Sequence, residues 1–177
     1  MTLLPQPVDS DHYWRAVHKQ ELPVWQPALA EIAALHQLPR ESLARVPLGR
    51  NIVFCSPTSI IKLGPPCWPG EMAREIAALH FVAGKLPIAT PIVLASGTLD
   101  QWDYIVQARL PGTPLWELWP QLPLKARTDL AFQHGQLMAQ IHSISIQHAP
   151  SEIQFNWNAL LAEQSGQCAA AMHHAGI

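Results

Sequence analysis

Lys62 lies in an otherwise apolar run at residues 60–63, a place where an ammonium group needs a partner. Side chains alternate between the two faces of a strand, so Lys62 and Ile60 would share one face. Burying an ammonium is costly unless a carboxylate or an anionic ligand faces it. The following segment offers Glu71 and Glu75, whose spacing puts them on one face of a helix. A lysine held by such a glutamate could bind the α- and β-phosphates of a nucleotide; the alternative is an edge-strand lysine that faces solvent.

Other groups of reactive residues favour ordinary structural roles. The nine histidines are scattered, and His173-His174 has no second ligand pair at a spacing that would bind a metal. The Ser-Pro-Thr-Ser segment at 56–59 is typical of a turn rather than of a catalytic nucleophile. Trp116 and Trp119 are more typical of packing between lobes than of a base-stacking platform, and 115–124 would expose an apolar patch if nothing covered it.

Composition excludes several classes of protein. Of the 177 residues, 49% are hydrophobic and 14% are charged, so the chain should form a packed core rather than a charge-rich disordered tail. The formal net charge of −2 provides no basic field for a nucleic acid partner. The sequence has three cysteines but no Cys-x-x-Cys pair, and it shows no signal-peptide pattern, so we expect a cytoplasmic protein. It has no apolar run of about 18 residues, so we expect no membrane partner.

Apolar periodicity and turn-forming residues predict the elements that position these groups. Ser10 is a candidate N-cap for the first helix, and Pro27 fits the first turn of the second. Gly84 is expected to end a helix, and the turn of a second hairpin is expected near Gly97 and Asp100. The expected elements, in chain order, are helices at 10–22 and 27–38, strands at 51–55 and 60–63, a helix at 71–83, strands at 92–95 and 102–108, and a helix with one apolar stripe at 124–145.

Six short motifs follow one another between residues 48 and 142. They are Leu48-Gly-Arg-Asn-Ile-Val-Phe54, Ile60-Ile-Lys-Leu63, Arg74-Glu-Ile-Ala-Ala-Leu79, Thr90-Pro-Ile-Val-Leu-Ala-Ser-Gly97, Tyr104-Ile-Val-Gln-Ala-Arg-Leu-Pro-Gly-Thr-Pro-Leu115 and Gly135-Gln-Leu-Met-Ala-Gln-Ile-His142. In this order and spacing, the chain resembles the aminoglycoside phosphotransferase family of small-molecule kinases.

The resemblance implies an α+β fold. We expect a protein-kinase-like N-lobe, which is a small antiparallel sheet with one packed helix, followed by the first helices of an incomplete helical C-lobe. The corresponding divisions are a helical N-terminal extension at 1–46, the N-lobe at 47–110, and the hinge exit with a truncated C-lobe at 111–177.

The resemblance also implies a nucleotide site. Lys62 would bind the phosphates and Glu75 would hold it, with Glu71 as the second choice of partner. The hinge, Gln107-Ala-Arg-Leu110, would meet the adenine edge through the Ala108 carbonyl and the Leu110 amide. Only Gly49 remains of a glycine-rich loop, so Arg50 and Asn51 would have to cover the phosphates.

The catalytic part of the family pattern has no counterpart in the sequence. Phosphoryl transfer needs an aspartate near the accepting hydroxyl and carboxylate or Asn ligands for Mg²⁺. The family supplies them after the long helix, whereas the last aspartate here is Asp129. We therefore predict the N-terminal part of an ATP-dependent small-molecule phosphotransferase that lacks its catalytic loop. It would bind ATP, would bind Mg²⁺ only if the missing C-lobe were supplied, and could take that lobe from a second chain. The alternatives are a non-catalytic kinase-fold binding or regulatory module and a non-functional gene fragment.

Overall fold

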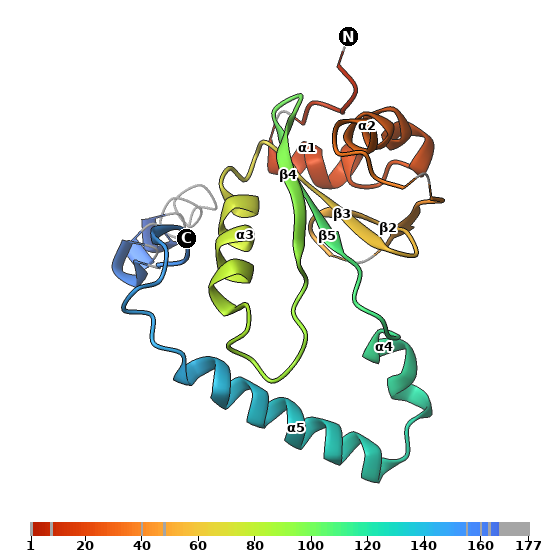
Figure 1. Ribbon diagram of the computed structural model, residues 1–177. Helices are drawn as coiled ribbons and strands as arrows, with labels where there is room; N and C mark the ends of the chain where they lie inside the picture. Colours follow the sequence, from red (N-terminus) through yellow and green to blue (C-terminus); the bar gives the residue numbers. More distant parts are fainter. Residues whose placement is uncertain are drawn as a thin grey trace, which may run out of the picture.

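The protein consists of a five-stranded antiparallel sheet between two helical layers (Figure 1). Helices α1 (Ser10–His12), η1 (Tyr13–Val17) and α2 (Leu22–Leu35) cover one face of the sheet, and helix α3 (Glu71–Val82) lies on the other face. This architecture confirms the predicted α+β class. The structure, a computed structural model, describes residues 2–7, 9–39, 41–47, 49–154, 156–159, 161–162 and 164–166. His173, His174 and Cys168 lie outside the described residues.

Both predicted hairpins are present, and they are joined into one sheet. Strand β3 lies at its centre, between β2 and β5. The sheet also contains β1, which the sequence did not indicate because a three-residue Ala-Arg-Val run shows no alternation. The strands are β1 (Ala44–Val46), β2 (Ile52–Cys55), β3 (Ser59–Gly64), β4 (Val93–Leu99) and β5 (Trp102–Ala108), in the order β1-β2-β3-β5-β4.

The turn between β4 and β5 lies later in the chain than predicted. Asp100 and Gln101 occupy it with φ values of 48° and 70°, the left-handed pair that suits a two-residue hairpin. Gly97, which was expected in the turn, lies inside β4 opposite Tyr104. It is needed there because a Cβ at this position would lie 2.5 Å from the Tyr104 hydroxyl.

The N-terminal helical segment is shorter than expected and partly of π type. Helix α1 (Ser10–His12) continues into the π-helix η1 (Tyr13–Val17). Asp9, not Ser10, is the N-cap, because its carboxylate accepts a hydrogen bond from the His12 amide.

Helix α2 (Leu22–Leu35) begins five residues before the predicted start. Pro23 occupies its first turn, so Pro27 lies inside the helix rather than at its beginning. An internal proline removes one backbone hydrogen bond. The buried stripe of Trp25, Ala28, Leu29 and Ile32, at helical spacing, offsets that loss by packing on the sheet.

One hydrophobic core joins the N-terminal helices to the sheet. Trp25 and Trp102 are fully buried and meet edge to face, with ring centroids 5.5 Å apart. The core-facing residues alternate along β2, β3 and β5, as expected for a half-buried sheet. The cluster contains Leu4, Tyr13, Val17, Trp25, Ala28, Leu29 and Ile32 from the N-terminal segment and Ile52, Phe54, Ile61, Leu63, Trp102, Tyr104 and Val106 from the sheet. The predicted boundary at residue 46 remains a prediction; in the structure, residues on both sides of it share this core.

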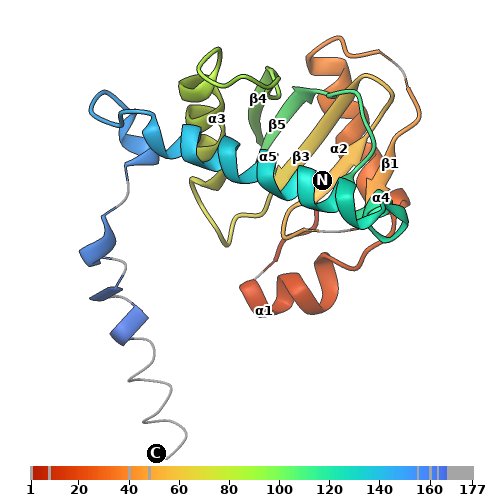
Figure 2. The ribbon, with the colours of Figure 1, turned by 90° about the horizontal axis from the view of Figure 1, so that it is seen from below.

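Helix α3 (Glu71–Val82) matches the predicted helix and is followed by Gly84 at φ 71°. Beyond the hinge come α4 (Leu115–Leu118), η2 (Trp119–Gln121), α5 (Leu124–Ser143) and η3 (Ser151–Ile153). Helix α5 passes along one end of the sheet and α3 (Figure 2). Its predicted apolar stripe is only partly covered, because α5 has no buried residue among those described.

The segment from α4 to α5 exposes large apolar side chains. Trp116 is 60% exposed, Trp119 is 38% exposed and Leu124 is 80% exposed. The apolar patch predicted at 115–124 is therefore present, and both tryptophans are part of it. Their predicted packing between lobes stays a prediction. Among the described residues, no helix has the length and apolar character needed to cross a membrane.

Gly97→Ala tests the close approach between β4 and β5. We expect it to lower the free energy of unfolding by about 1–3 kcal/mol, because the new methyl group must displace the buried Tyr104 ring. Gly135→Ala is the matched control, since a Cβ at this exposed position in α5 meets nothing within 4 Å. The control should be neutral or stabilising by up to about 1 kcal/mol. Equal stabilities of the two variants in chemical denaturation would contradict this account of Gly97.

Candidate nucleotide site

Lys62 projects from β3 on the face opposite the core. The strand alternates so that Ile61 and Leu63 are buried in the core, and Lys62 faces α3. Its Nζ lies 2.6 Å from Glu75 Oε1, and both side chains are 26% exposed. The structure thus brings together the two residues that were predicted to act as a pair, and the lysine is not an edge-strand residue that faces solvent.

The two glutamates of α3 have different partners. Glu71, the second choice as partner of Lys62, forms an ion pair with Arg50 instead. The Arg50 guanidinium also lies over the Trp68 ring, 5.0 Å from its centroid. One turn of α3 therefore holds the strand lysine through Glu75 and the segment before β2 through Glu71.

Gln107 is a site residue that the sequence indicated only as the first residue of the hinge, with no contact to Glu75 predicted. Its Nε2 donates to Glu75 Oε1 at 2.8 Å, the same oxygen that Lys62 contacts. The side chain is only 4% exposed. Register explains the contact, because Gln107 pairs with Ile60, and Ile60 and Lys62 lie on one face of β3. The available signal was a glutamine that directly follows the apolar run Tyr104-Ile-Val106 near the end of the strand.

A cleft of about 700 Å³ opens at the hinge that follows β5. This volume is in the range of small-molecule sites and suits a nucleotide. Ala108 and Leu110, the predicted hinge residues, both line it, whereas Lys62 and Asn51 are not among its lining residues. Lys62 lies next to the cleft, because Ile60 and Gln107 on the same sheet face do line it. The residues that line it include Cys55, Ile60, Gln107, Ala108, Leu110 and Trp116.

Hydrogen bonds fix the backbone of the hinge. The Ala108 amide donates to Ile92 O at 2.8 Å, and the Arg109 amide donates to Thr58 O at 2.9 Å. Arg109 Nη1 also donates to Ser56 O at 2.8 Å. Neither the Ala108 carbonyl nor the Leu110 amide takes part in these three bonds. Their predicted role at a purine edge is compatible with this arrangement and remains a prediction.

Asn51 lies one residue before β2. Its Oδ1 is buried and has no hydrogen-bond partner in the part of the chain that the structure describes. An unpaired buried acceptor is unfavourable, so a donor from a ligand or from water would be favourable here. An amide oxygen cannot donate to a phosphate, so any phosphate contact of Asn51 would use its amide NH₂ or its backbone N–H.

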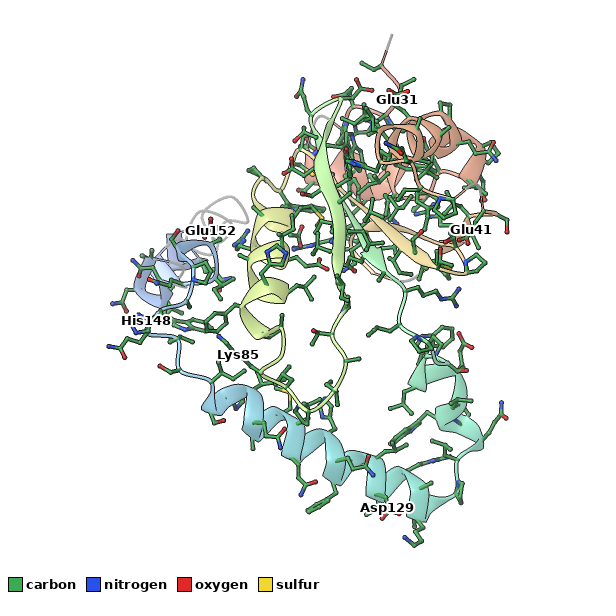
Figure 3. All side chains as sticks on the ribbon, viewed as in Figure 1. Glu31, Glu41, Lys85, Asp129, His148 and Glu152 are labelled. Atoms are coloured by element: carbon green, nitrogen blue, oxygen red, sulfur yellow. The ribbon has the colours of Figure 1, made fainter. Side chains whose placement is uncertain are left out.

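No cluster suited to a metal is present within the described residues. No three His, Cys, Asp or Glu side chains gather closely enough to hold an ion there. Figure 3 shows Asp129 on the first part of α5, directed away from the sheet, and Glu152 beyond α3. Asp129 is paired with Lys125 at 2.7 Å. These residues do not provide the ligand set for Mg²⁺.

An antiparallel sheet with a lysine paired to the packed helix, followed by a hinge cleft, defines the N-lobe of a protein-kinase-like fold. Residues 50–176 match the phosphotransferase enzyme family (APH), and the chain belongs to this family. A search of curated proteins found no match.

Two solved structures share the fold. One is a mutant of aminoglycoside 2'-phosphotransferase IIIa in a GDP complex, with a TM-score of 0.63 and 17% identity over 80% of this chain. The other is the ternary complex of streptomycin, ATP and APH(2″)-IIa, with a TM-score of 0.62 and 16% identity over 84% of this chain. The match covers 49% of the first structure and 52% of the second, so the chain spans about half of their length.

Gln107→Leu tests whether the amide supports the ion pair. Loss of its donor leaves a partly buried carboxylate with one bond fewer, so the free energy of unfolding should fall by about 1–3 kcal/mol. Gln133→Leu, an exposed position in α5, is the matched control and should change stability by less than about 0.5 kcal/mol. Denaturant titrations measure both values, and a neutral Gln107→Leu would contradict the supporting role.

Proposed function

We propose that the chain is the nucleotide-binding half of an ATP-dependent phosphotransferase that acts on a hydroxyl group of a small molecule. The observation that carries this proposal is the Lys62–Glu75 ion pair beside the hinge cleft. Family membership supports the phosphotransferase class. The GDP and ATP complexes among the solved structures support a nucleotide as the ligand. The division at 47–110 and 111–177 is part of the same proposal.

In this proposal each residue has one task toward ATP. The adenine occupies the hinge cleft and meets the Ala108 carbonyl and the Leu110 amide. The Lys62 ammonium neutralises phosphate charge, and Glu75 with Gln107 keeps its Nζ in place. Because the carboxylate already restricts the long lysine side chain, this side chain loses less conformational entropy when it binds phosphate. Asn51 and the loop before β2 lie beside the phosphates.

We further propose that this sequence does not supply the catalytic loop. Transfer breaks the bond from the γ-phosphorus to the bridging oxygen of ADP, forms a bond to the acceptor oxygen, and moves the hydroxyl proton to a base. Each aspartate of the chain already has a structural contact. Asp9 caps α1, Asp11 pairs with Arg15, Asp100 accepts from the Leu4 amide, Asp103 accepts from Thr98, and Asp129 pairs with Lys125.

The exposed side chains of α4 and α5 support a further part of the proposal. Trp116 and Leu124 are the kind of apolar surface that additional C-lobe polypeptide would bury. That polypeptide, in the same protein or in a second chain, would bring the base and the Mg²⁺ ligands. The acceptor would then be bound mainly outside the residues described above.

Lys62→Ala should weaken ATP binding by about tenfold to a hundredfold and leave adenosine affinity unchanged. A hydrogen bond to a charged group contributes about 1.5–3 kcal/mol, and adenosine has no phosphate for the lysine to contact. Lys125→Ala is the matched control, because its side chain is 85% exposed and far along the chain on α5. Isothermal titration calorimetry gives all the affinities. Unchanged ATP affinity in Lys62→Ala would contradict the phosphate role.

The chain alone should bind ATP without transferring its γ-phosphate. The measurement is transfer of labelled phosphate from ATP to streptomycin, with APH(2″)-IIa and an acceptor that it phosphorylates as the positive control for the assay. Labelled product from the chain alone would contradict the absence of a catalytic loop. Adding the C-terminal half of a related phosphotransferase separates the remaining cases: restored transfer would favour a two-part enzyme, and none would favour a non-catalytic nucleotide-binding module.

A further inference from the structure

The loop before β2 is held from the core side by two side chains of the N-terminal segment. His18 Nε2 lies 3.0 Å from the Gly49 carbonyl oxygen. Because a carbonyl only accepts, this ring nitrogen must carry a proton and donate. The Tyr13 hydroxyl donates to the next carbonyl, that of Arg50, at 2.5 Å. Two consecutive peptide groups of the loop are thus bound to one short helical segment that lies more than thirty positions earlier in the chain.

The π-helix explains how one segment reaches both carbonyls. The His18 amide donates to Tyr13 O at 2.7 Å, an i→i+5 bond that closes one π turn between them. In an α-helix, residues five apart would lie about 140° apart around the axis. The wider turn brings the two rings together instead, with centroids 5.5 Å apart. Isolated π turns are often found at functional sites.

Packing makes the Tyr13 donor rigid. The side chain is fully buried, and its ring meets Trp68 edge to face with centroids 5.1 Å apart. Burial raises the pKa of the Tyr13 phenol well above its usual range, so the hydroxyl keeps its proton at all physiological pH values. Trp68 also lies under the Arg50 guanidinium, which Glu71 holds from α3. The loop is therefore fixed through both its backbone and its arginine side chain.

Peptide geometry determines where the amides of this loop point. In a planar trans peptide, the C=O of one residue and the N–H of the next point in opposite directions. Because the Gly49 and Arg50 carbonyls are directed at His18 and Tyr13, the Arg50 and Asn51 amides are directed away from them. Successive amides that point the same way form a concave anion site. The positive φ of Gly49, 108°, suits the sharp bend at which the loop begins.

We propose that Tyr13 and His18 are positioning residues for nucleotide phosphate, acting through the Gly49 and Arg50 carbonyls to aim the Arg50 and Asn51 amides at it. This rests on the proposed ATP site and adds a task for the N-terminal segment. Neither side chain contacts the nucleotide. Their effect is therefore specific for phosphate and absent for adenosine, which distinguishes loop positioning from general support of the fold.

The test uses the whole chain and four variants. Tyr13→Phe removes only the hydroxyl, His18→Leu removes the donor, and His18→Gln restores a donor. Tyr104→Phe is the matched control, since Tyr104 is also a buried tyrosine of the core and its hydroxyl bonds to His36 at 2.8 Å, not to the loop. Calorimetric titrations with ATP and with adenosine give the affinities, and hydrogen exchange by mass spectrometry follows the peptide that covers residues 49–53 without nucleotide.

We expect Tyr13→Phe and His18→Leu each to lower the affinity for ATP about fivefold, which corresponds to the loss of one ordinary hydrogen bond. The affinity for adenosine should stay unchanged. Exchange at 49–53 should rise in both, while His18→Gln and Tyr104→Phe stay near wild type. Equal losses for ATP and adenosine, or no loss for either, would overturn the positioning role. If the wild-type chain bound no nucleotide, the proposed function would fail, and the phosphate role with it. Exchange would then still show whether the two side chains order the loop, and unchanged exchange would overturn that as well.

Discussion

Alternation along β3 is the constraint on which the rest of this structure depends. Ile61 and Leu63 point into a core built jointly with the N-terminal helices, so Lys62 must point to the other face. An ammonium there requires a carboxylate, and α3 supplies one through Glu75. The packing of α3 on the sheet and the position of the Lys62 side chain therefore depend on each other. A one-residue slip of β3 would bury the lysine in the core and expose its apolar neighbours.

Helix α3 connects the two parts of the candidate site. Glu75 holds the central strand through Lys62, and Glu71, one turn earlier, holds Arg50 in the loop before β2. The N-terminal segment holds the same loop through Tyr13 and His18. The loop contains only one glycine, so few of its backbone dihedral angles have the wide range that glycine allows. Its conformation is therefore set mainly by the contacts with α3 and with the N-terminal segment. The segment at 1–46 therefore both covers one face of the sheet and holds the loop before β2.

The part of the chain after the hinge has a different physical character. The sheet and its two helical layers enclose fully buried tryptophans, whereas α5 has no buried residue among those described. Apolar side chains such as Trp116 and Leu124 meet solvent over α4 and α5. Stability must come chiefly from the core around β3, because hydrophobic stabilisation scales with the apolar area removed from water. The exposed helices contribute little of it.

Sequence by itself determined both hairpins and helix α3 through local periodicity and turn residues, and the cost of an unpaired ammonium pointed to a glutamate of α3 as the partner of Lys62. The fold family, and Glu75 rather than Glu71 as that partner, followed from the resemblance of the six motifs to the aminoglycoside phosphotransferase family. Tertiary structure alone decided the rest. Pro27 lies inside α2 because a buried stripe outweighs one lost hydrogen bond. Gln107 and Glu75 meet because strand register brings together residues 32 positions apart. The π turn at Tyr13 forms where two side chains bind one loop. Such contacts are set by packing between distant segments, which no local pattern encodes.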